Sequence, residues 1–274
     1  MPELPEVETV RKCLEQQIKG RKILQCQKFR DDLRIPFPDN LIDVCSNSKV
    51  NNIMRRSKYL LFDIEKDDYL VIHLGMSGKI TFGDVDYERV KHDHLIFNLE
   101  GGGKMIFNDP RRFGLVTLVN RRNFSQHKLF SGLGAEPFDQ DFGGNYLKNI
   151  FKNKTQPIKL ALMDSRNLVG VGNIYAAESL FRSGINPKIA AGNISLKRLE
   201  VLAGNIRQVL SEAIESGGST LRDYVRSDGD IGYFQHKFKV YGRENQACEI
   251  CGTLIKRIVQ QNRSTFYCPN CQKR

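Results

Sequence analysis

The chain opens with an amphipathic helical pattern and then changes to short β-rich runs. Over residues 5–19 apolar residues recur at helical spacing, with Pro5 in the first turn and Gly20 just past the end. The apolar positions of this predicted helix are Val7, Val10, Leu14 and Ile18. From about residue 22 to 120 the apolar residues form short runs, which predicts an antiparallel sandwich or barrel. The clearest runs are KYLLFDIE, YLVIHLGM, HLIFNLE, KMIFND and GLVTLV.

After residue 124 the pattern becomes helical again. Four segments have apolar residues at helical spacing, namely 145–152, 157–163, 173–183 and 195–215. The last has the most continuous apolar stripe, made of Leu196, Leu199, Leu202, Ile206, Val209, Leu210, Ala213 and Ile214. The polar, glycine-containing segment that follows is predicted to be a mobile loop. These changes of pattern predict three domains, over residues 1–123, 124–235 and 236–274.

Four cysteines in the last predicted domain are spaced as a zinc site: Cys248, Cys251, Cys268 and Cys271. Each CxxC pair offers two thiolates to one ion from a tight turn, and the 16-residue spacer fits a β-hairpin. Four thiolates complete a tetrahedron, so we predict one structural Zn²⁺ per chain. Two disulfides are the alternative, which the absence of a secretory signal pattern at the N-terminus disfavours.

Charge points to a polyanionic partner. The formal net charge is +11 and the isoelectric point is about 9.3, which favours nucleic acid over a merely solvated basic surface. Residues 236–274 hold eight Lys or Arg against two acidic residues, so the predicted zinc hairpin is expected to contact phosphate. No apolar run approaches the roughly 18 residues of a membrane span. We therefore expect a cytoplasmic, nucleoid-associated monomer without a membrane partner.

Seven motifs together resemble the formamidopyrimidine-DNA glycosylase family: MPELPEVETV, RRSKYL, HLGMSG, KHDH, DPRRFG, LVGVGNIYAAESLF and NRSTFYC. The resemblance spans nearly the whole chain. It implies an α+β multidomain fold with an N-terminal β-sandwich and leading helix, a helix–two-turn–helix domain and a C-terminal zinc-finger hairpin. It also implies a base-excision-repair glycosylase and abasic-site lyase. Such an enzyme removes oxidised purines, mainly 8-oxoguanine and formamidopyrimidines, from double-stranded DNA and cuts the strand by β,δ-elimination.

The resemblance makes Pro2 the nucleophile once Met1 is removed. A terminal α-amine has a pKa of about 7.7–8.0, so a useful fraction is neutral near pH 7, whereas an ordinary Lys amine is almost wholly protonated. The family match makes Glu3 an acid/base carboxylate, Lys58 a proton donor in β-elimination and Arg263 a group for δ-elimination. Glu6 either orients the nucleophile or compensates the helix dipole.

Other family positions match DNA contacts. Met76, Arg111 and Phe113 match side chains that fill the space left by a flipped base; without the resemblance, Met76 and Phe113 are ordinary core residues at strand ends. The remaining candidate DNA contacts are His73, His92, Lys154, Lys159, Asn173 and Tyr241. Two alternatives stay open, because His92 and His94 also fit an HxH metal pair and Asn173 also fits a helix N-cap. The loop 219–235 matches the family's lesion lid, with Thr220, Arg222 and Tyr224 as its contacts.

Three rival functions remain. An endonuclease VIII-like enzyme has the same scaffold but acts on oxidised pyrimidines. A non-catalytic protein that binds damaged DNA predicts no covalent imine. A zinc-ribbon adaptor that binds proteins predicts no steep salt dependence of DNA binding.

Overall fold

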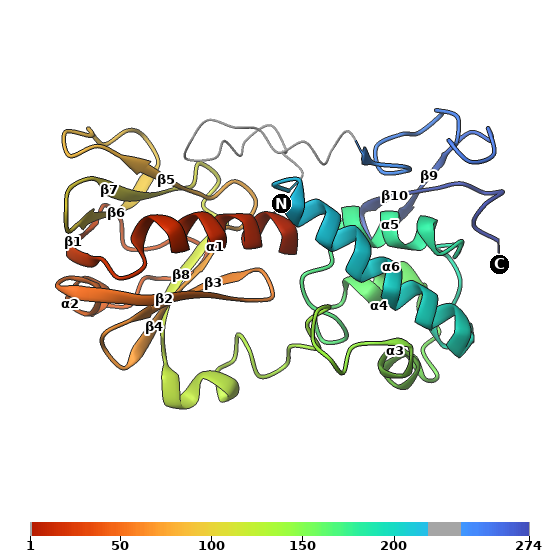
Figure 1. The fold of residues 1–274 in the computed structure, drawn as a ribbon, viewed down its shortest axis with the longest axis horizontal. Coiled ribbons are helices and arrows are strands. Elements are labelled where there is room, and N and C mark those ends of the chain that lie inside the picture. The colour runs from red at the N-terminus through yellow and green to blue at the C-terminus, as the bar shows by residue number, and fades with distance from the viewer. Residues whose placement is uncertain (1, 219–236, 274) are drawn as a thin grey trace. The chain divides into compact units, whose positions relative to one another are not determined.

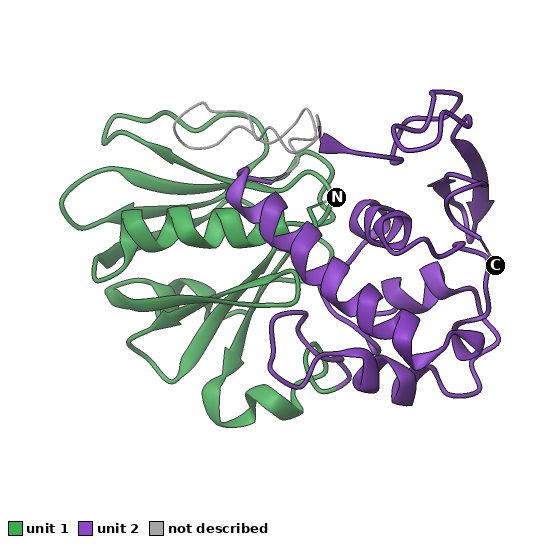
Figure 2. Ribbon diagram, turned by 45° about the vertical axis from the view of Figure 1, so that its right-hand side comes forward, with its two compact units in different colours: residues 1–131, 220–232 green, residues 132–219, 233–274 purple. Residues whose placement is uncertain are grey.

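The computed structural model describes residues 2–218 and 237–273 (Figure 1). The predicted lid contacts Thr220, Arg222 and Tyr224 lie outside these residues. The described chain divides into two compact units (Figure 2). Unit 1 covers residues 2–131, and unit 2 covers residues 132–218 with 237–273.

Unit 1 is an antiparallel β-sandwich with a leading helix. Its elements are α1 (Leu4–Ile18), β1 (Lys22–Lys28), α2 (Leu41–Cys45), β2 (Ser48–Arg56), β3 (Tyr59–Ile64), β4 (Asp68–His73), β5 (Lys79–Gly83), β6 (Asp93–Leu99), β7 (Lys104–Asn108), β8 (Leu115–Asn120) and the 3₁₀ turn η1 (Arg121–Gln126). The strand order is β5-β7-β6-β1-β2-β3-β4-β8. Strands β1 and β2 pair at only two positions, so the sheet folds there into two halves. Side chains from both halves, such as Phe97 and Phe62, share one core, which confirms the predicted sandwich.

The five predicted apolar runs are strands β3, β4, β6, β7 and β8. The glycine-rich segment after β6 forms a hairpin turn to β7, with Gly101 and Gly102 at φ +78° and +90°. The other three strands of unit 1, β1, β2 and β5, are not among the clear apolar runs in the sequence. In β2, for example, buried positions alternate with polar ones along SKVNNIMRR, so the apolar signal is diluted.

Helix α1 lies along β2, and its register places the N-terminus of the chain. The Arg11 guanidinium donates to the Ile53 carbonyl at 3.2 Å, and the Arg55 guanidinium donates to the Glu8 carboxylate at 2.9 Å. Moving toward the start of α1 therefore means moving along β2 toward the β2–β3 turn. Lys58 lies in that turn, so the start of α1 and Lys58 are at the same end of unit 1.

Unit 2 combines a helical core with a zinc-finger hairpin. Its elements are α3 (Gly144–Phe151), α4 (Ile158–Met163), α5 (Asn173–Arg182), the 3₁₀ turn η2 (Ala191–Asn193), α6 (Leu196–Glu215), β9 (Lys256–Gln260) and β10 (Arg263–Tyr267). All four predicted helices are present, within one residue at each end. The stripe on α6 begins one turn later than predicted, because Leu196 is 38% exposed and Leu199 is the first buried position. No helix among residues 2–218 and 237–273 is long and apolar enough to cross a membrane.

Candidate active site and nucleic-acid interface

The N-terminal residues are fixed by a reciprocal capping box. Glu3 is the N-cap of α1, and its backbone N–H donates to the Glu6 carboxylate at 2.9 Å, while the Glu3 carboxylate accepts from the Glu6 N–H. Pro2, Glu3 and Glu6 are all buried within the described chain. Glu6 therefore holds the backbone directly beside Pro2. As a first-turn acid Glu6 also complements the helix dipole, and its role in orienting the nucleophile stays a prediction.

Lys58, Tyr59 and His73 gather at the end of one half-sheet. Ser57 has φ +57°, and with Lys58 it makes the two-residue turn between β2 and β3. Tyr59 is opposite His73 in the β3–β4 pairing, and the two rings are 4.9 Å apart between centroids. Lys58 is thus part of a rigid hairpin turn rather than a strand-surface charge. The β-sheet register places it next to the half-buried His73.

His73 is held as a neutral acceptor. Its Nδ1 accepts the backbone N–H of Gly75 at 2.9 Å, which requires that nitrogen to be unprotonated. Burial, followed by the nearby charges of Lys58 and Arg34, lowers the pKa of His73 to about 4. The neutral ring therefore supports the turn that begins at Gly75. Whether His73 also contacts DNA stays a prediction.

We expect the His73 ring to stay neutral down to about pH 4. Its pKa in the unfolded chain is about 6.5, so between pH 6.5 and 4 the unfolded state binds more protons and stability falls as the pH falls. The measurement is an NMR titration of the histidine ring C–H signals, with the His73→Asn variant identifying the signal. An Asn side chain also offers an acceptor to the Gly75 N–H. A titration midpoint at or above pH 6 would contradict this prediction.

Met76, Arg111 and Phe113 project from two turns that interlock. Met76 and Phe113 are 41% and 46% exposed, so neither is the core residue that strand-end position suggests. The Arg111 guanidinium lies 5.0 Å from the centroid of the Phe113 ring. At Gly75, where φ is +63°, an added Cβ would be 2.4 Å from the Phe113 carbonyl carbon. The turns therefore touch through their backbones.

One buried carboxylate holds both turns. Asp109 is fully buried, and it accepts the Ser77 hydroxyl at 2.6 Å through one oxygen and the Gly114 N–H at 2.7 Å through the other. The Ser77 hydroxyl oxygen in turn accepts the Arg111 N–H at 3.2 Å. Asp109 was not a predicted site residue. An acid two residues after the apolar run KMIF was its only signal in the sequence.

The KHDH segment is tied to Asp109 by hydrogen bonds. His92 has φ +73°, and its carbonyl accepts the Asp109 N–H at 3.1 Å. The two rings of the HxH pair are 6.4 Å apart, and Nε2 of His94 already hydrogen-bonds the Asp109 carbonyl at 2.8 Å. Among the described residues, the four cysteines are the only group of three or more His, Cys, Asp or Glu side chains close enough to hold a metal ion together. The described part of the chain therefore offers no third ligand to the metal-pair alternative for His92 and His94.

In unit 2, Asn173 and Tyr241 meet the zinc hairpin. Asn173 is the first residue of α5, and Gly172 rather than Asn173 is the N-cap, which corrects the alternative reading. The Asn173 amide donates to the Ser264 carbonyl at 3.0 Å and to the Tyr241 hydroxyl at 3.4 Å. The buried Lys159 ammonium donates to the Asn173 side-chain oxygen at 2.5 Å and to the Ser264 carbonyl at 3.1 Å. Helix α5 therefore begins against β10, where its dipole favours an anion.

The segment that carries Tyr241 is anchored by Glu178, which the sequence analysis missed. This buried carboxylate on α5 accepts the backbone N–H groups of Lys239, Val240 and Tyr241 at 2.9, 3.0 and 2.8 Å. Burial raises the pKa of Glu178, and the three N–H donors act in the opposite direction. In the sequence, the only indication of this role was a single acid inside the apolar stretch IYAAESLF.

Arg263 lies at the tip of the zinc hairpin. Gln261 and Asn262 have φ +46° and +59°, so they make a two-residue turn between β9 and β10. Arg263 is the first residue after the turn and is exposed, one residue from the Ser264 carbonyl that Asn173 and Lys159 contact. Within unit 2, the structure therefore brings Arg263, Asn173 and Tyr241 to one region.

Lys154 is held by a different contact. Its ammonium donates to the Asn167 side-chain oxygen at 2.6 Å, and its carbonyl accepts the Gly192 N–H at 2.9 Å. Its role in DNA binding stays a prediction.

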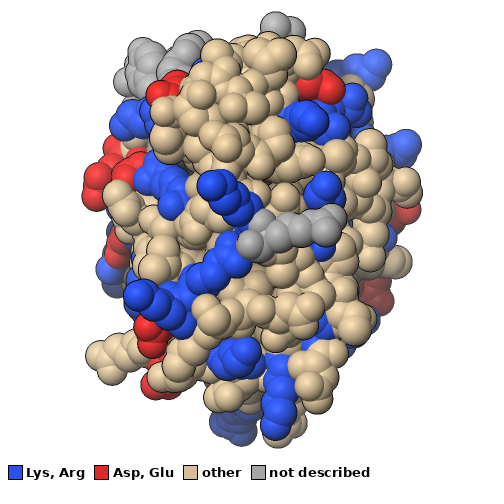
Figure 3. All heavy atoms as spheres, turned by 90° about the vertical axis from the view of Figure 1, so that its right-hand side faces the viewer, with Lys and Arg blue, Asp and Glu red and all other residues tan. Residues whose placement is uncertain are grey.

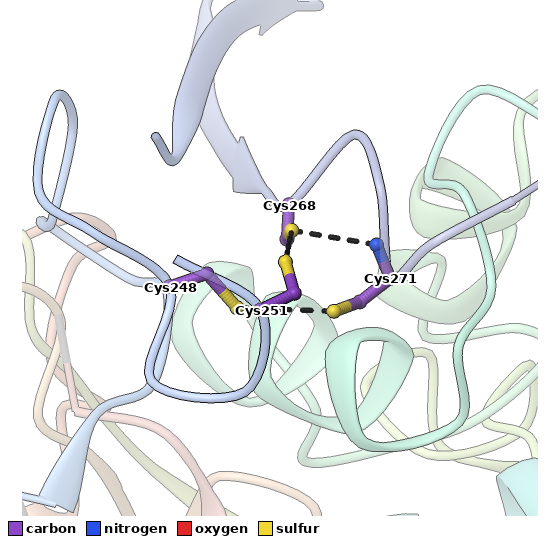
Figure 4. Close-up of side chains that lie close together, drawn as sticks. All are labelled: Cys248, Cys251, Cys268 and Cys271. Atoms are coloured by element: carbon purple, nitrogen blue, oxygen red, sulfur yellow. Dashed lines mark hydrogen bonds between the residues drawn. The ribbon is translucent and has the colours of Figure 1, made fainter. Parts of the chain in front are cut away.

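The four cysteines have the geometry of a tetrahedral zinc site (Figure 4). All their Sγ atoms lie within 4.8 Å of one another, with 3.8 Å between Cys248 and Cys271 and 3.5 Å between Cys251 and Cys268. A Zn–S distance of about 2.3 Å in a tetrahedron requires sulfur atoms about 3.8 Å apart. The residues therefore fit a structural Zn²⁺, and the free thiols rule out the two-disulfide alternative.

Basic side chains are prominent on the surface. Figure 3 shows one face on which Lys and Arg gather and acidic side chains are fewer. This agrees with the net charge of +11.

Comparison with known protein families gives three matches in chain order. Residues 1–116 match the formamidopyrimidine-DNA glycosylase N-terminal domain, and residues 133–225 match the formamidopyrimidine-DNA glycosylase H2TH domain. Residues 245–274 match the zinc finger found in FPG and IleRS. The formamidopyrimidine-DNA glycosylases of Rhizobium etli and Ruegeria pomeroyi are 45% and 46% identical to the chain, over the whole length of each protein.

Solved structures give the same result. A complex of a Lactococcus lactis FPG variant with Fapy-dG-containing DNA superposes with a TM-score of 0.92 at 33% identity, covering all of both chains. MutM in complex with carbocyclic 8-oxo-G-containing DNA gives a TM-score of 0.91 at 34% identity, again over all of both chains. These matches confirm the predicted fold, with its leading helix, β-sandwich, helix–two-turn–helix domain and zinc-finger hairpin.

Proposed function

The chain belongs to the formamidopyrimidine-DNA glycosylase family, and we propose that Pro2 is the nucleophile with which it acts on damaged DNA. The protein is a DNA glycosylase and abasic-site lyase that removes oxidised purines from duplex DNA. One observation best supports the proposed nucleophile. The buried capping box of Glu3 and Glu6 fixes the backbone beside Pro2, at the same end of unit 1 as Lys58.

The chemistry follows from the properties of a secondary amine. The nitrogen of Pro2, free once Met1 is removed, attacks the sugar C1′, and the C1′–base bond breaks with its electron pair leaving on the base. Opening of the sugar ring gives an iminium between Pro2 and C1′. A proline iminium has no N–H proton to lose, so it stays cationic and acidifies the C2′ protons. Loss of a C2′ proton then expels the 3′ phosphate, and a second elimination expels the 5′ phosphate.

Three further side chains have proposed roles in these steps. Glu3 is next to the amine, so its carboxylate is placed to deliver a proton to the ring oxygen or the departing base. Lys58, in the rigid β2–β3 turn, is proposed to donate a proton during β-elimination. Arg263, at the tip of the zinc hairpin, is proposed to bind the lesion phosphates and to assist δ-elimination.

The interlocked turns of unit 1 are proposed to replace the flipped base. Flipping costs a few kcal/mol of lost stacking and pairing. Exposed apolar and planar side chains offset part of that cost by entering the stack. Met76 and Phe113 have the required exposure, and Arg111 is proposed to hydrogen-bond the orphaned cytosine.

The remaining predicted contacts are proposed to bind the DNA backbone. In unit 2, Asn173 and Tyr241 lie at the N-terminal end of α5, where backbone N–H groups favour phosphate. His73, His92 and Lys154 are proposed as further contacts. The four thiolates would hold Zn²⁺, which shapes the hairpin and supplies no step of the reaction.

Borohydride trapping tests the proposed function. The protein is incubated with a duplex that contains 8-oxoguanine opposite cytosine, the mixture is reduced, and the cross-linked peptide is mapped by mass spectrometry. We expect one cross-link, at Pro2. A cross-link at a lysine would show that this lysine, and not Pro2, is the nucleophile. If a chain shown to start at Pro2 forms no cross-link, the protein binds DNA without the proposed covalent chemistry.

A second lesion class is supported by one comparison. A Lactococcus lactis Fpg complex with DNA that contains an oxidised pyrimidine superposes with a TM-score of 0.91 at 33% identity. We propose oxidised pyrimidines as secondary substrates, which a panel of lesion-containing duplexes would rank against 8-oxoguanine. We also propose a monomer, in the cytoplasm with the nucleoid, with domain boundaries near residues 123/124 and 235/236.

A further inference from the structure

Arg34 is an exposed cation to which the mechanism above gives no role. It is at the apex of a tight loop over residues 29–37 in unit 1, where the Leu33 N–H donates to the Ile35 carbonyl at 3.0 Å. Asp32 and Pro36 form an isolated bridge across the same loop. Across residues 2–218 and 237–273, the Arg34 guanidinium has no hydrogen-bond or ion-pair partner. Its neighbour Arg30, by contrast, is ion-paired with Asp32.

The loop is fixed to the turns that carry the proposed DNA contacts. The Arg34 N–H donates to the Gly114 carbonyl at 3.2 Å, directly after Phe113. At the base of the loop, the Phe29 N–H donates to the His94 carbonyl at 3.1 Å, two residues from His92. Arg34 therefore has a fixed backbone beside both groups of proposed contacts, although its side chain is exposed.

The charges of Arg34 and Lys58 both act on the His73 ring. Burial is the main cause of the low pKa of His73, and the charges of Lys58 and Arg34 both add to it. The charge of Arg34 also acts on Tyr59, the residue that follows Lys58. Two like charges at one end of a domain repel each other, and a bound anion would remove that repulsion.

We propose that Arg34 is a further substrate-binding residue, which binds a DNA phosphate beside the turn that presents Phe113. The planar guanidinium matches two phosphate oxygens at once, and no competing carboxylate has to be displaced. The inference rests on the proposed function, because it takes damaged duplex DNA as the ligand.

The test compares Arg34→Gln with Arg122→Gln, which makes the same charge change elsewhere in unit 1. Arg122 is exposed and follows β8, whose six residues separate it from Gly114 by about 20 Å. Binding to a duplex with an uncleavable abasic-site analogue is measured from 50 to 300 mM salt. We expect Arg34→Gln to reduce the log–log salt slope by about 0.9 and to weaken binding about 10-fold, with the Arg34→Lys slope unchanged. The single-turnover rate at saturating protein should stay within about twofold, because the contact binds substrate without touching the reacting atoms.

Replacing single phosphates by methylphosphonates locates the contact. A methylphosphonate at one position should weaken DNA binding by the wild-type protein and leave DNA binding by Arg34→Gln unchanged. An Arg34→Gln slope equal to that of the wild type, or equal effects of every methylphosphonate on both proteins, would overturn the proposal. If the wild-type protein itself binds damaged duplex without salt dependence, the proposed function fails instead.

Discussion

A chain that keeps Met1 ahead of Pro2 should form no covalent complex with abasic-site DNA and should lose at least about 10³-fold in strand cutting. Met1 turns the nitrogen of Pro2 from a secondary amine into an amide. The lone pair of an amide nitrogen is delocalised into its carbonyl, so it cannot attack C1′. We would measure covalent complex formation by borohydride trapping and strand cutting by gel assay. The N-terminus of each preparation is verified by intact mass.

Pro5→Ala is the matched control for this result. Pro5 is also a buried proline in the first turn of α1, but it has no free amine in either preparation. The variant should still be trapped at Pro2. Binding to an uncleavable abasic-site duplex, measured on all preparations, separates loss of chemistry from loss of affinity. Equal trapping with Met1 present would exclude Pro2 as the nucleophile.

Cys268→Ala should lose bound zinc and at least about 100-fold in affinity for abasic-site DNA. Cys268 is fully buried in the small core it shares with Val240 and Ile255, so losing the ion also loosens the hairpin. Arg263 and the Ser264 carbonyl would then lose their fixed position relative to Asn173. Zinc content by mass spectrometry and binding by fluorescence anisotropy make the measurement.

Cys26→Ala is the matched control for the zinc prediction. Cys26 is a buried free thiol in the core of unit 1, away from the four ligands along the chain. This variant should keep its zinc and its affinity. Chelation of zinc from the wild-type protein should reproduce the Cys268→Ala defect, and added zinc should reverse it. Full affinity in a verified zinc-free protein would show that the hairpin does not need the ion.

The periodic patterns predicted the large elements because those elements bury one face. The stripe on α6 and the runs that became β3 and β6 are apolar wherever they meet a core. Strand β2 was not distinct, since its polar positions face outward and interrupt the apolar signal. The predicted start of α5 at residue 173 is confirmed, and only the alternative that made Asn173 the N-cap is wrong, because Gly172 takes that position without any polar side chain.

The candidate site was predictable only in part. The four cysteine ligands follow from spacing, because a metal imposes its own geometry on short motifs. The supporting residues depend on contacts between segments far apart in the chain, so no local pattern reveals them. Glu178 meets residues about 60 positions later, and the roles of Asp109 and the neutral His73 emerge only when their turns are folded together.

The single carboxylate that ties together the turns of unit 1 has a consequence for how this enzyme would search long DNA. Asp109 holds the segments that present Met76, Arg111 and Phe113, so these side chains project from one rigid support. Inserting them into a base stack requires little ordering of the protein. The free-energy cost of each trial insertion is then almost entirely the cost of deforming the DNA. A weakened base pair would therefore open more readily than an intact one. Damage would thus be sampled first by how readily the duplex opens, before the lesion itself reaches the active site.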